Sequence, residues 1–297
     1  MHARRHRRLG PSALIVLAAL AGALPVPASS QDRPLRVAVG PFLPTPSDTR
    51  AAYEPFFRHI ATALGERHEL TVANDWAGIA IALANEQVDI AWMGPWGYVL
   101  SHHEGEARAV ATVKYDGRPF YHAIIMARPG LDIARFPEDA RGLRISFADV
   151  GSTSGWLIPH YWFKGQGIDP RRFFQYRDGA SHAANIVSVA NGQVDLATDF
   201  DRNRDGMIAR GAVTAEATRI VWRSDPLPND PLVVRRGFAA ADETKLQAAL
   251  LAIDEEKAKV VMPPRYTGWI AANHSSYSII EDAGVAVGRL QPRTNAR

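Results

Sequence analysis

Two segments of this chain repeat one another at a nearly constant spacing. Residues 81–91 read IALANEQVDIA and residues 187–197 read VSVANGQVDLA, an offset of 106 positions (187 minus 81). The apolar openings LRV at 35–37 and LRI at 143–145 lie 108 positions apart (143 minus 35). Two separate matches at almost the same spacing indicate that the chain contains two similar units.

The first unit alternates strands and helices. We expect strands at 35–40, 70–73 and 88–92, and helices at 49–64 and 79–84, the first helix being capped by Ser47 or Asp48. Apolar residues recur at intervals of four along the longer helix, which is the period of a helix with one buried face. This alternation is typical of an α/β sheet with parallel strands.

Long apolar segments on either side of the second unit are expected to connect two lobes. They are strand candidates at 119–128 and 230–235, and a further helix is expected at 245–260. The predicted fold is therefore α/β with two lobes, each a mixed sheet flanked by helices, joined by two crossover strands. The first lobe is expected to comprise residues 31–122 and 232–297, and the second lobe residues 123–231.

Residues 1–30 have the pattern of a secretory signal peptide rather than of folded structure. Four arginines lie within residues 4–8, an apolar segment covers 13–24, and small residues follow at 25–30. The apolar segment is too short for a stable membrane span, and cleavage after Ala28 or Ser30 fits the pattern. We expect an exported protein located in the periplasm, without a lipid anchor.

Removing this leader changes the charge balance. Lys plus Arg fall from 34 to 30 while Asp plus Glu stay at 31, so the formal charge changes from +3 to about −1. The basic character of the full chain is therefore no indication of nucleic-acid binding. The chain has no cysteine, which excludes disulfides, thiol catalysis and cysteine-ligated clusters.

A small polar loop, GSTSG at residues 151–155, follows the apolar segment 143–150 and precedes a helical pattern. Free backbone N–H groups and the positive end of a helix dipole converge at such a turn, so it suits an anion. Ser152 could equally be an ordinary helix N-cap. Ligands of open α/β sheets lie beyond the carboxyl ends of the strands, so residues 93–98 and 198–202 are expected near the same cleft.

Taken together, five stretches resemble the phosphonate-binding proteins of phosphonate and phosphite ABC importers, in the type II periplasmic-binding-protein superfamily. They are VDIAWMGP at 88–95, GSTSG at 151–155, ASHAA at 180–184, NGQVDLAT at 191–198 and PNDPLVVR at 228–235. The stretches have the family's order and spacing, and together they extend over most of the chain after the leader.

The resemblance implies which residues hold the phosphonate group. Ser152, Thr153 and Ser154 would bind its oxygens through hydroxyl and backbone N–H groups, and His182 would be a further donor. Considered alone, His182 fits a buried histidine at a helix start better than a ligand contact, and only the ordered family match favours the ligand contact. The family's aromatic contacts fall on Trp76, where a tyrosine is usual, and on Tyr121 or its neighbour Phe120.

Specificity is expected to depend on the other end of the site. Family members that carry aminoalkylphosphonates clasp the ammonium with two carboxylates; one aligns with Asp230 and the other with Arg202. A cation at that position repels an amine, so we expect 2-aminoethylphosphonate not to be the preferred ligand. Two alternatives stay open: Asp199 or Asp201 supplies the missing carboxylate, or Arg202 points to solvent beside Arg204.

The expected function is capture of a phosphonate or a related oxyanion such as phosphite and its delivery to an ABC permease. We expect no catalytic residue, metal or cofactor, and a monomer. The alternatives are a ligand-presenting subunit of a membrane sensor and a secreted enzyme. The loop at 151–155 has Thr153 where a nucleophile elbow needs serine, and no Ser–His–Asp set or Walker loop is recognisable elsewhere. The histidines lack metal-ligand spacing.

Overall fold

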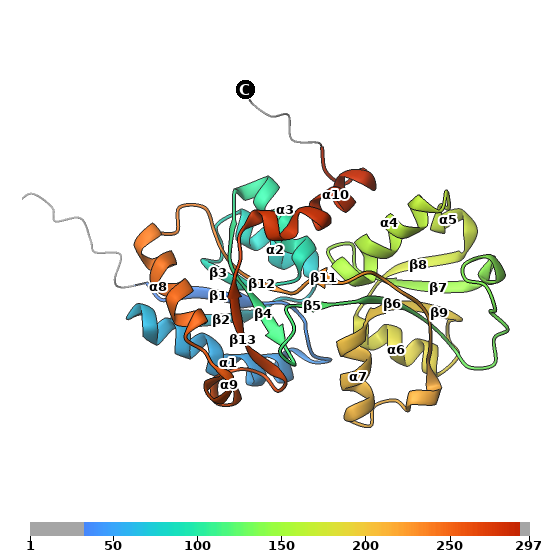
Figure 1. Cartoon of the computed structure of the whole chain (residues 1–297), viewed down its shortest axis with the longest axis horizontal. Coiled ribbons are helices and arrows are strands. Elements are labelled where there is room, and N and C mark those ends of the chain that lie inside the picture. The colour runs from blue at the N-terminus through green and yellow to red at the C-terminus, as the bar shows by residue number, and fades with distance from the viewer. Residues whose placement is uncertain (1–32, 292–297) are drawn as a thin grey trace, which may run out of the picture. The chain divides into compact units, whose positions relative to one another are not determined.

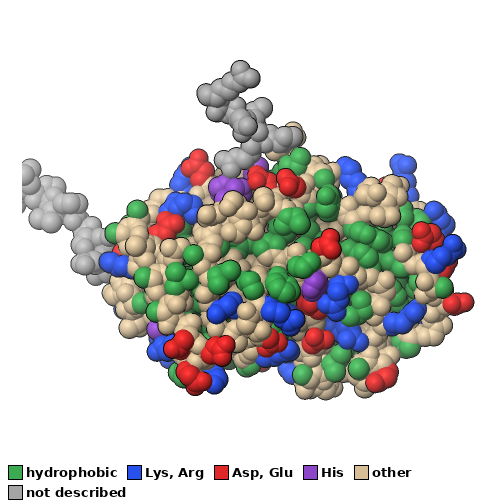
Figure 2. Space-filling model, in the orientation of Figure 1, with side chains coloured by type: hydrophobic (Ala, Val, Ile, Leu, Met, Phe, Trp, Pro, Cys, Tyr) green, Lys and Arg blue, Asp and Glu red, His purple; other side chains and the backbone are tan. Residues whose placement is uncertain are grey.

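The computed structural model describes residues 33–291, so the predicted signal peptide at 1–30 lies outside the described residues. Helices flank two separate mixed sheets, as expected (Figure 1). Within residues 33–291, no helix is both long enough and apolar enough to cross a membrane. On the face drawn in Figure 2, basic and acidic side chains are interspersed rather than separated by sign.

The larger sheet has six strands in the order β13-β4-β12-β3-β1-β2. Its strands are β1 (Leu35–Val39), β2 (His68–Val72), β3 (Ile90–Trp92), β4 (Arg108–Tyr115), β12 (Pro231–Val234) and β13 (Tyr266–Ala271). β1 runs parallel to β2 and β3, whereas β12, β4 and β13 join by antiparallel pairing. The sheet is therefore built from the start and the end of the described chain.

Helices cover both faces of the six-stranded sheet (Figure 1). One face carries α1 (Pro46–Leu64), α8 (Ala240–Leu251) and α9 (Glu255–Val261), and the other carries α2 (Trp76–Ala84), α3 (Pro95–Gly105) and α10 (Ser278–Ala286). Phe56, Phe57 and Ile60 of α1 are fully buried against the strands. Each such apolar side chain contributes about 1.5–3 kcal/mol through removal from water.

The smaller sheet has five strands in the order β10-β6-β9-β7-β8. Its strands are β6 (Ala123–Ala127), β7 (Arg144–Ala148), β8 (Gln175–Ala180), β9 (Leu196–Phe200) and β10 (Arg219–Arg223). Its helices are α4 (Ile158–Gly165), α5 (Pro170–Phe173), α6 (His182–Ala190) and α7 (Asp201–Ala209). Parallel pairing joins β7 to β8 and β9, as it joins β1 to β2 and β3, so the two sheets repeat one arrangement.

The chain passes between the two sheets through a short antiparallel pair, β5 (Phe120–Tyr121) and β11 (Leu227–Pro228). Two residue pairs make up this ladder, Leu227 with Tyr121 and Pro228 with Phe120. Short 3-10 turns occur at Glu138–Ala140, Ala215–Ala217 and His274–Tyr277. The expected connecting strand at 119–128 is thus divided, since β5 and β6 belong to different sheets.

The expected limits of three helices are wrong, and the shortest of these helices begins at Trp76 instead of Ile79. The first helix begins at Pro46 and is capped by Thr45, whose hydroxyl accepts the Asp48 N–H at 3.1 Å. Proline suits the first helical position because its missing N–H has no partner there anyway. The helix expected at 245–260 is two helices, because a second start occurs at Asp254, whose carboxylate accepts the Lys257 N–H at 2.8 Å.

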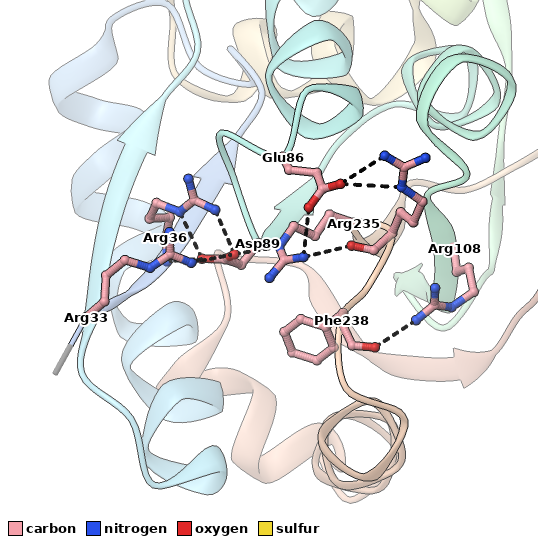
Figure 3. Close-up of polar contacts among 8 residues, drawn as sticks. Arg33, Arg36, Glu86, Asp89, Arg108, Arg235 and Phe238 are labelled. Carbon is pink, nitrogen blue, oxygen red and sulfur yellow. Dashed lines mark hydrogen bonds and ion pairs between the residues drawn. The ribbon is translucent and has the colours of Figure 1, made fainter. Parts of the chain in front are cut away.

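Asp89, just before β3, ties together two segments of the larger sheet through three arginines, two at or just before the start of β1 and one after β12 (Figure 3). Its carboxylate accepts the Arg36 backbone N–H at 3.0 Å, the Arg36 guanidinium at 2.8 Å, the Arg235 Nε at 2.7 Å and Arg33 at 3.2 Å. Burial opposes ionisation of Asp89, but the hydrogen bonds from Arg36 and Arg235 outweigh it and hold the pKa at about 2.

Asp195 repeats this arrangement in the smaller sheet. Its carboxylate accepts the Arg144 backbone N–H at 3.0 Å, the Arg144 guanidinium at 3.0 Å and the Arg128 Nε at 2.8 Å. These hydrogen bonds, that of Arg144 above all, hold the pKa of Asp195 well below its usual range. The VD dipeptide in both repeated sequences therefore marks the same contact in each sheet.

Candidate functional site

One small cavity collects all eight residues for which a ligand contact was predicted. The central cavity has a volume of about 20 Å³, room for roughly one or two water molecules. It is lined by Phe42, Trp76, Gly94, Tyr121, Ser152, Thr153, Ser154, His182, Phe200, Arg202 and Asp230. Gly94 follows β3, residues 152–154 follow β7 and Phe200 ends β9, so the lining lies at the carboxyl ends of strands as expected.

The loop at 151–155 folds into a tight turn that opens a π-helical turn, Thr153–Leu157, ahead of α4. Ser152 is the N-cap, and its hydroxyl accepts the Gly155 N–H at 3.1 Å. Both glycines are required by close approach: a Cβ on Gly151 would lie 2.3 Å from the Ala77 N, and one on Gly155 would lie 2.3 Å from the Ala148 Cβ. Ser152 is thus a helix cap that also faces the central cavity.

Thr153 links the loop to the other sheet. Its hydroxyl oxygen accepts the backbone N–H of Trp96 at 2.8 Å, and the indole N–H of Trp96 donates to the Val150 carbonyl at 3.1 Å. The Trp96 amide lies in the first turn of α3, where a backbone N–H has no partner within its own helix. The two contacts hold the loop of one sheet against a helix start of the other.

His182 lies between two side chains at the floor of the central cavity. Its Nε2 is 2.9 Å from the Ser152 Oγ, and its Nδ1 is 2.8 Å from the Asp199 Oδ1. The amide nitrogen of Asn203 donates to both Asp199 oxygens at 3.1 Å. Burial raises the pKa of Asp199, opposed by the hydrogen bond from His182.

Two sequence-based statements are corrected by this geometry. Asp199 does not replace a carboxylate at the far end of the site, because it is fully buried behind His182. Ser152, His182 and Asp199 also form a hydrogen-bonded Ser–His–Asp chain. The sequence did not reveal it, because Ser152 and His182 are 30 positions apart and His182 and Asp199 are 17 positions apart.

Aromatic side chains form another part of the cavity wall. Trp76 begins α2 and contacts Phe42 edge-on, with ring centroids 4.9 Å apart. Of the two neighbours left open by the sequence, Tyr121 lines the cavity and Phe120 is 37% exposed. Burial raises the pKa of the Tyr121 phenol, so this phenol stays protonated and can donate.

Arg202 and Asp230 close the remaining end of the central cavity as an ion pair. The Arg202 Nη2 lies 2.8 Å from the Asp230 Oδ2, and the two side chains are 9% and 4% exposed. The guanidinium also lies over aromatic rings, with its carbon 4.8 Å from the Tyr121 centroid and 5.0 Å from that of Tyr115. The alternative that Arg202 points to solvent is therefore wrong.

The pair leaves unused donors inside the protein. The Nε and Nη1 atoms of Arg202 are buried and have no hydrogen-bond partner. Burial raises the pKa of Asp230 while the Arg202 charge opposes this rise. Asp201 does not supply a second carboxylate here, since it pairs with Arg223 at 3.1 Å.

Three lining residues were not singled out from the sequence: Phe42, Gly94 and Phe200. Gly94 and Phe200 belong to the segments at 93–98 and 198–202. These segments were expected near the cleft by the strand-end rule, that ligands of open α/β sheets lie beyond the carboxyl ends of the strands. Phe42 follows β1, so the same rule applied to the first strand would have found it.

The fold and the cavity define a class: α/β proteins of two repeated sheets that enclose a compact polar site between them. A family model described as "ABC transporter, phosphonate, periplasmic substrate-binding protein" matches residues 42–277. The chain therefore belongs to this family of periplasmic substrate-binding proteins, which are not enzymes.

Individual relatives agree with the family. The phosphonates-binding periplasmic protein of Escherichia coli is 27% identical over 198 residues, covering 65% of this chain and 59% of that protein. The phosphate-import protein PhnD of Mycolicibacterium smegmatis is 28% identical over 207 residues, covering 66% and 63%. The alignments thus span about three fifths of each relative.

A solved structure extends the comparison to the fold. A binding protein component of an ABC phosphonate transporter from Pseudomonas aeruginosa has a TM-score of 0.78 and 25% identity. That comparison covers 86% of this chain and 87% of the other. The two-sheet architecture is thus shared with a binding protein component of an ABC phosphonate transporter over most of its length.

Proposed function

We propose that this protein captures a compact phosphorus oxyanion, phosphite or a small phosphonate without an amino group, and delivers it to an ABC permease. In this proposal Ser152, Thr153, Ser154 and His182 contact the oxygens, while Trp76 and Tyr121 cover them. Family membership supports the ligand class, and the hydroxyl loop supplies donors at a helix start, which suits an anion.

The buried pair of Arg202 and Asp230 is the observation that supports the proposed size and charge of the ligand. It occupies the end of the central cavity where an aminoalkyl chain would extend, and little volume remains beside it. An ammonium group placed about 4 Å from the Arg202 guanidinium would be repelled by that one charge by roughly 4 kcal/mol at an effective dielectric constant of about 20, and the Asp230 carboxylate that could offset this repulsion is already paired with Arg202. The unused Arg202 donors favour an additional oxygen instead.

The domain organisation belongs to the same proposal. We propose that residues 31–122 and 232–297 belong to one lobe and residues 123–231 to the other, with β5 and β11 as the hinge; residues 31–32 and 292–297 lie outside the described residues. A ligand that contacts both lobes favours the closed arrangement. Export by the leader at 1–30 places the protein in the periplasm, where it acts as a monomer.

Calorimetric titration with phosphite, methylphosphonate, phosphate, a carboxylated phosphonate and 2-aminoethylphosphonate tests the proposal. We expect the tightest binding for a small anion without an amine. The variant Arg202→Met should bind phosphite more weakly, whereas the matched variant Arg204→Met should not, because Arg204 contacts Thr218 and Ala215 away from the central cavity. Preference of the wild type for 2-aminoethylphosphonate would refute the exclusion argument.

A protein that presents its ligand to a membrane sensor instead of a permease would give the same titration result. A transport assay separates the two: cells that lack the protein but retain the permease should lose uptake of the tightest ligand. Normal uptake in such cells, together with loss of a transcriptional response, would favour the ligand-presenting subunit of a sensor.

A further inference from the structure

The hydrogen-bond roles in the line from Ser152 to Asp199 follow from its buried end. Every neighbour that contacts the Asp199 oxygens is a donor: His182, the amide nitrogen of Asn203 and the Phe200 backbone N–H. Donors alone around a carboxyl group are the surroundings of an ionised carboxylate. The Nδ1 of His182 therefore carries a hydrogen and donates it to Asp199.

The state of the other ring nitrogen decides what Ser152 can offer a ligand. A serine hydroxyl has one hydrogen and two acceptor positions, and the Gly155 N–H fills one of these positions. If the imidazole is neutral, its Nε2 accepts the Ser152 hydrogen, and none remains for an anion. If the ring is an imidazolium, Nε2–H fills the second acceptor position at 2.9 Å, and the Ser152 hydrogen becomes free.

The surrounding charges also favour the change of His182 from imidazole to imidazolium when an anion binds. Four ionisable groups act on His182: Asp199 in direct contact, Asp149 and Asp230 through space, and Arg202 across the central cavity. Arg202 balances Asp230, so with a neutral imidazole the charge of Asp199, directly behind His182, has no cationic partner in contact with it. Protonation of His182 offsets that charge and so lowers the repulsion that an entering anion meets.

We infer that anion capture is coupled to protonation of His182, and that Asp199 is the positioning residue which makes this possible. The inference rests on the proposed function, since it needs a phosphorus oxyanion in the central cavity. On binding, the Ser152 hydrogen turns from Nε2 to a ligand oxygen, and Nε2 gains one proton. This proton comes from solution, or from the ligand when the ligand itself carries an acidic hydrogen.

Proton uptake on binding is measurable without knowledge of the natural ligand. Titrations of the wild type with phosphite, in two buffers of different ionisation enthalpy, give the number of protons taken up per anion bound. We expect uptake to be larger for the wild type than for Asp199→Asn, and the variant to bind about tenfold more weakly or worse, because a charge-assisted contact becomes a neutral one. Protonation of phosphite itself contributes equally to both proteins.

Two further variants distinguish a positioning role of Asp199 from a general loss of structure. Asp205→Asn removes an exposed acid of the same helix as Asn203 and should leave proton uptake unchanged. His182→Gln keeps a neutral N–H donor toward Ser152 and cannot take up a proton, so phosphite affinity should become less dependent on pH than in the wild type.

The wild type alone provides a measurement if Asp199→Asn does not fold. Ring nitrogen shifts of labelled histidine distinguish imidazole from imidazolium, and comparison with His182→Gln assigns the signal. We expect His182 to be an imidazolium in the phosphite complex at a pH where it is neutral without ligand.

The outcomes are distinguishable. Phosphite binding with equal proton uptake in the wild type and Asp199→Asn, or an imidazole that stays neutral in the complex, overturns the inference while leaving the proposed function intact. Failure of the wild type to bind any of the phosphorus anions overturns the proposed function itself.

Discussion

Replacing Asp89 by asparagine tests whether the aspartate–arginine contact described for each sheet stabilises the fold. The substitution keeps the shape of the side chain and removes its charge. Arg36 and Arg235 then lose their shared carboxylate partner, although both arginines retain contact with water. We expect a less stable protein at neutral pH, with the binding site itself unchanged.

The magnitude follows from the pKa of Asp89, which is about 2 in the folded protein against an ordinary value of 3.8. Each pKa unit corresponds to about 1.4 kcal/mol, so the contact contributes on the order of 2 kcal/mol to the free energy of unfolding. Because the folded-state pKa is the lower one, this contribution is complete above about pH 4 and is lost as the pH falls through about 2.

Denaturant unfolding of the wild type and Asp89→Asn at several pH values checks both statements. The stability difference should be about 2 kcal/mol near pH 7 and should shrink between about pH 4 and about pH 2. Asp242→Asn is the matched control, since Asp242 forms an exposed pair with Lys245 and should change stability by less than about 0.5 kcal/mol. A difference that stays constant across the acid range would refute the reasoning.

Two further predictions concern the loop at 151–155. Thr153→Ala removes a hydroxyl facing the central cavity and the partner of the Trp96 N–H; it should weaken phosphite binding by about 1.5–3 kcal/mol, and unchanged affinity in calorimetry would remove Thr153 from the site. Gly155→Ala places a Cβ against Ala148 and should lower stability by about 1–3 kcal/mol in thermal unfolding, whereas Gly165→Ala, with nothing within 4 Å, should not; equal effects would contradict the packing argument.

The sequence predicted the architecture well where local patterns dominate. The strand at 35–40 and the loop at 151–155 each have a pattern or composition that depends only on near neighbours, and so does each of the two matching segments at 81–91 and 187–197. Helix limits were less well predicted: the Asp254 N-cap divides an apolar pattern that looked continuous from 245 to 260. Capping depends on a single side chain, which periodicity averages out.

The sequence predicted which residues would lie together, but it did not predict their contacts with one another. The strand-end rule and the family motifs brought the eight residues to one cavity, because strand order determines where loops meet. Whether Asp199 faces an amine or a histidine depends on side-chain packing between β9 and α6. Whether the Arg202 side chain is buried or points to solvent depends on aromatic residues from distant segments, among them Tyr115. Such contacts leave no local signal in the sequence.

Tyr121 belongs both to the connection between the two sheets and to the wall of the central cavity, which bears on how ligand binding could be coupled to a movement of the sheets. It pairs with Leu227 in the two-residue ladder where the chain passes between the sheets, and its side chain also forms part of the cavity wall. If the ladder is the proposed hinge, a rotation of one sheet against the other moves the phenol that lines the central cavity. In the proposed function, recognition and movement therefore share one residue, and no relay through the protein interior is needed to connect them.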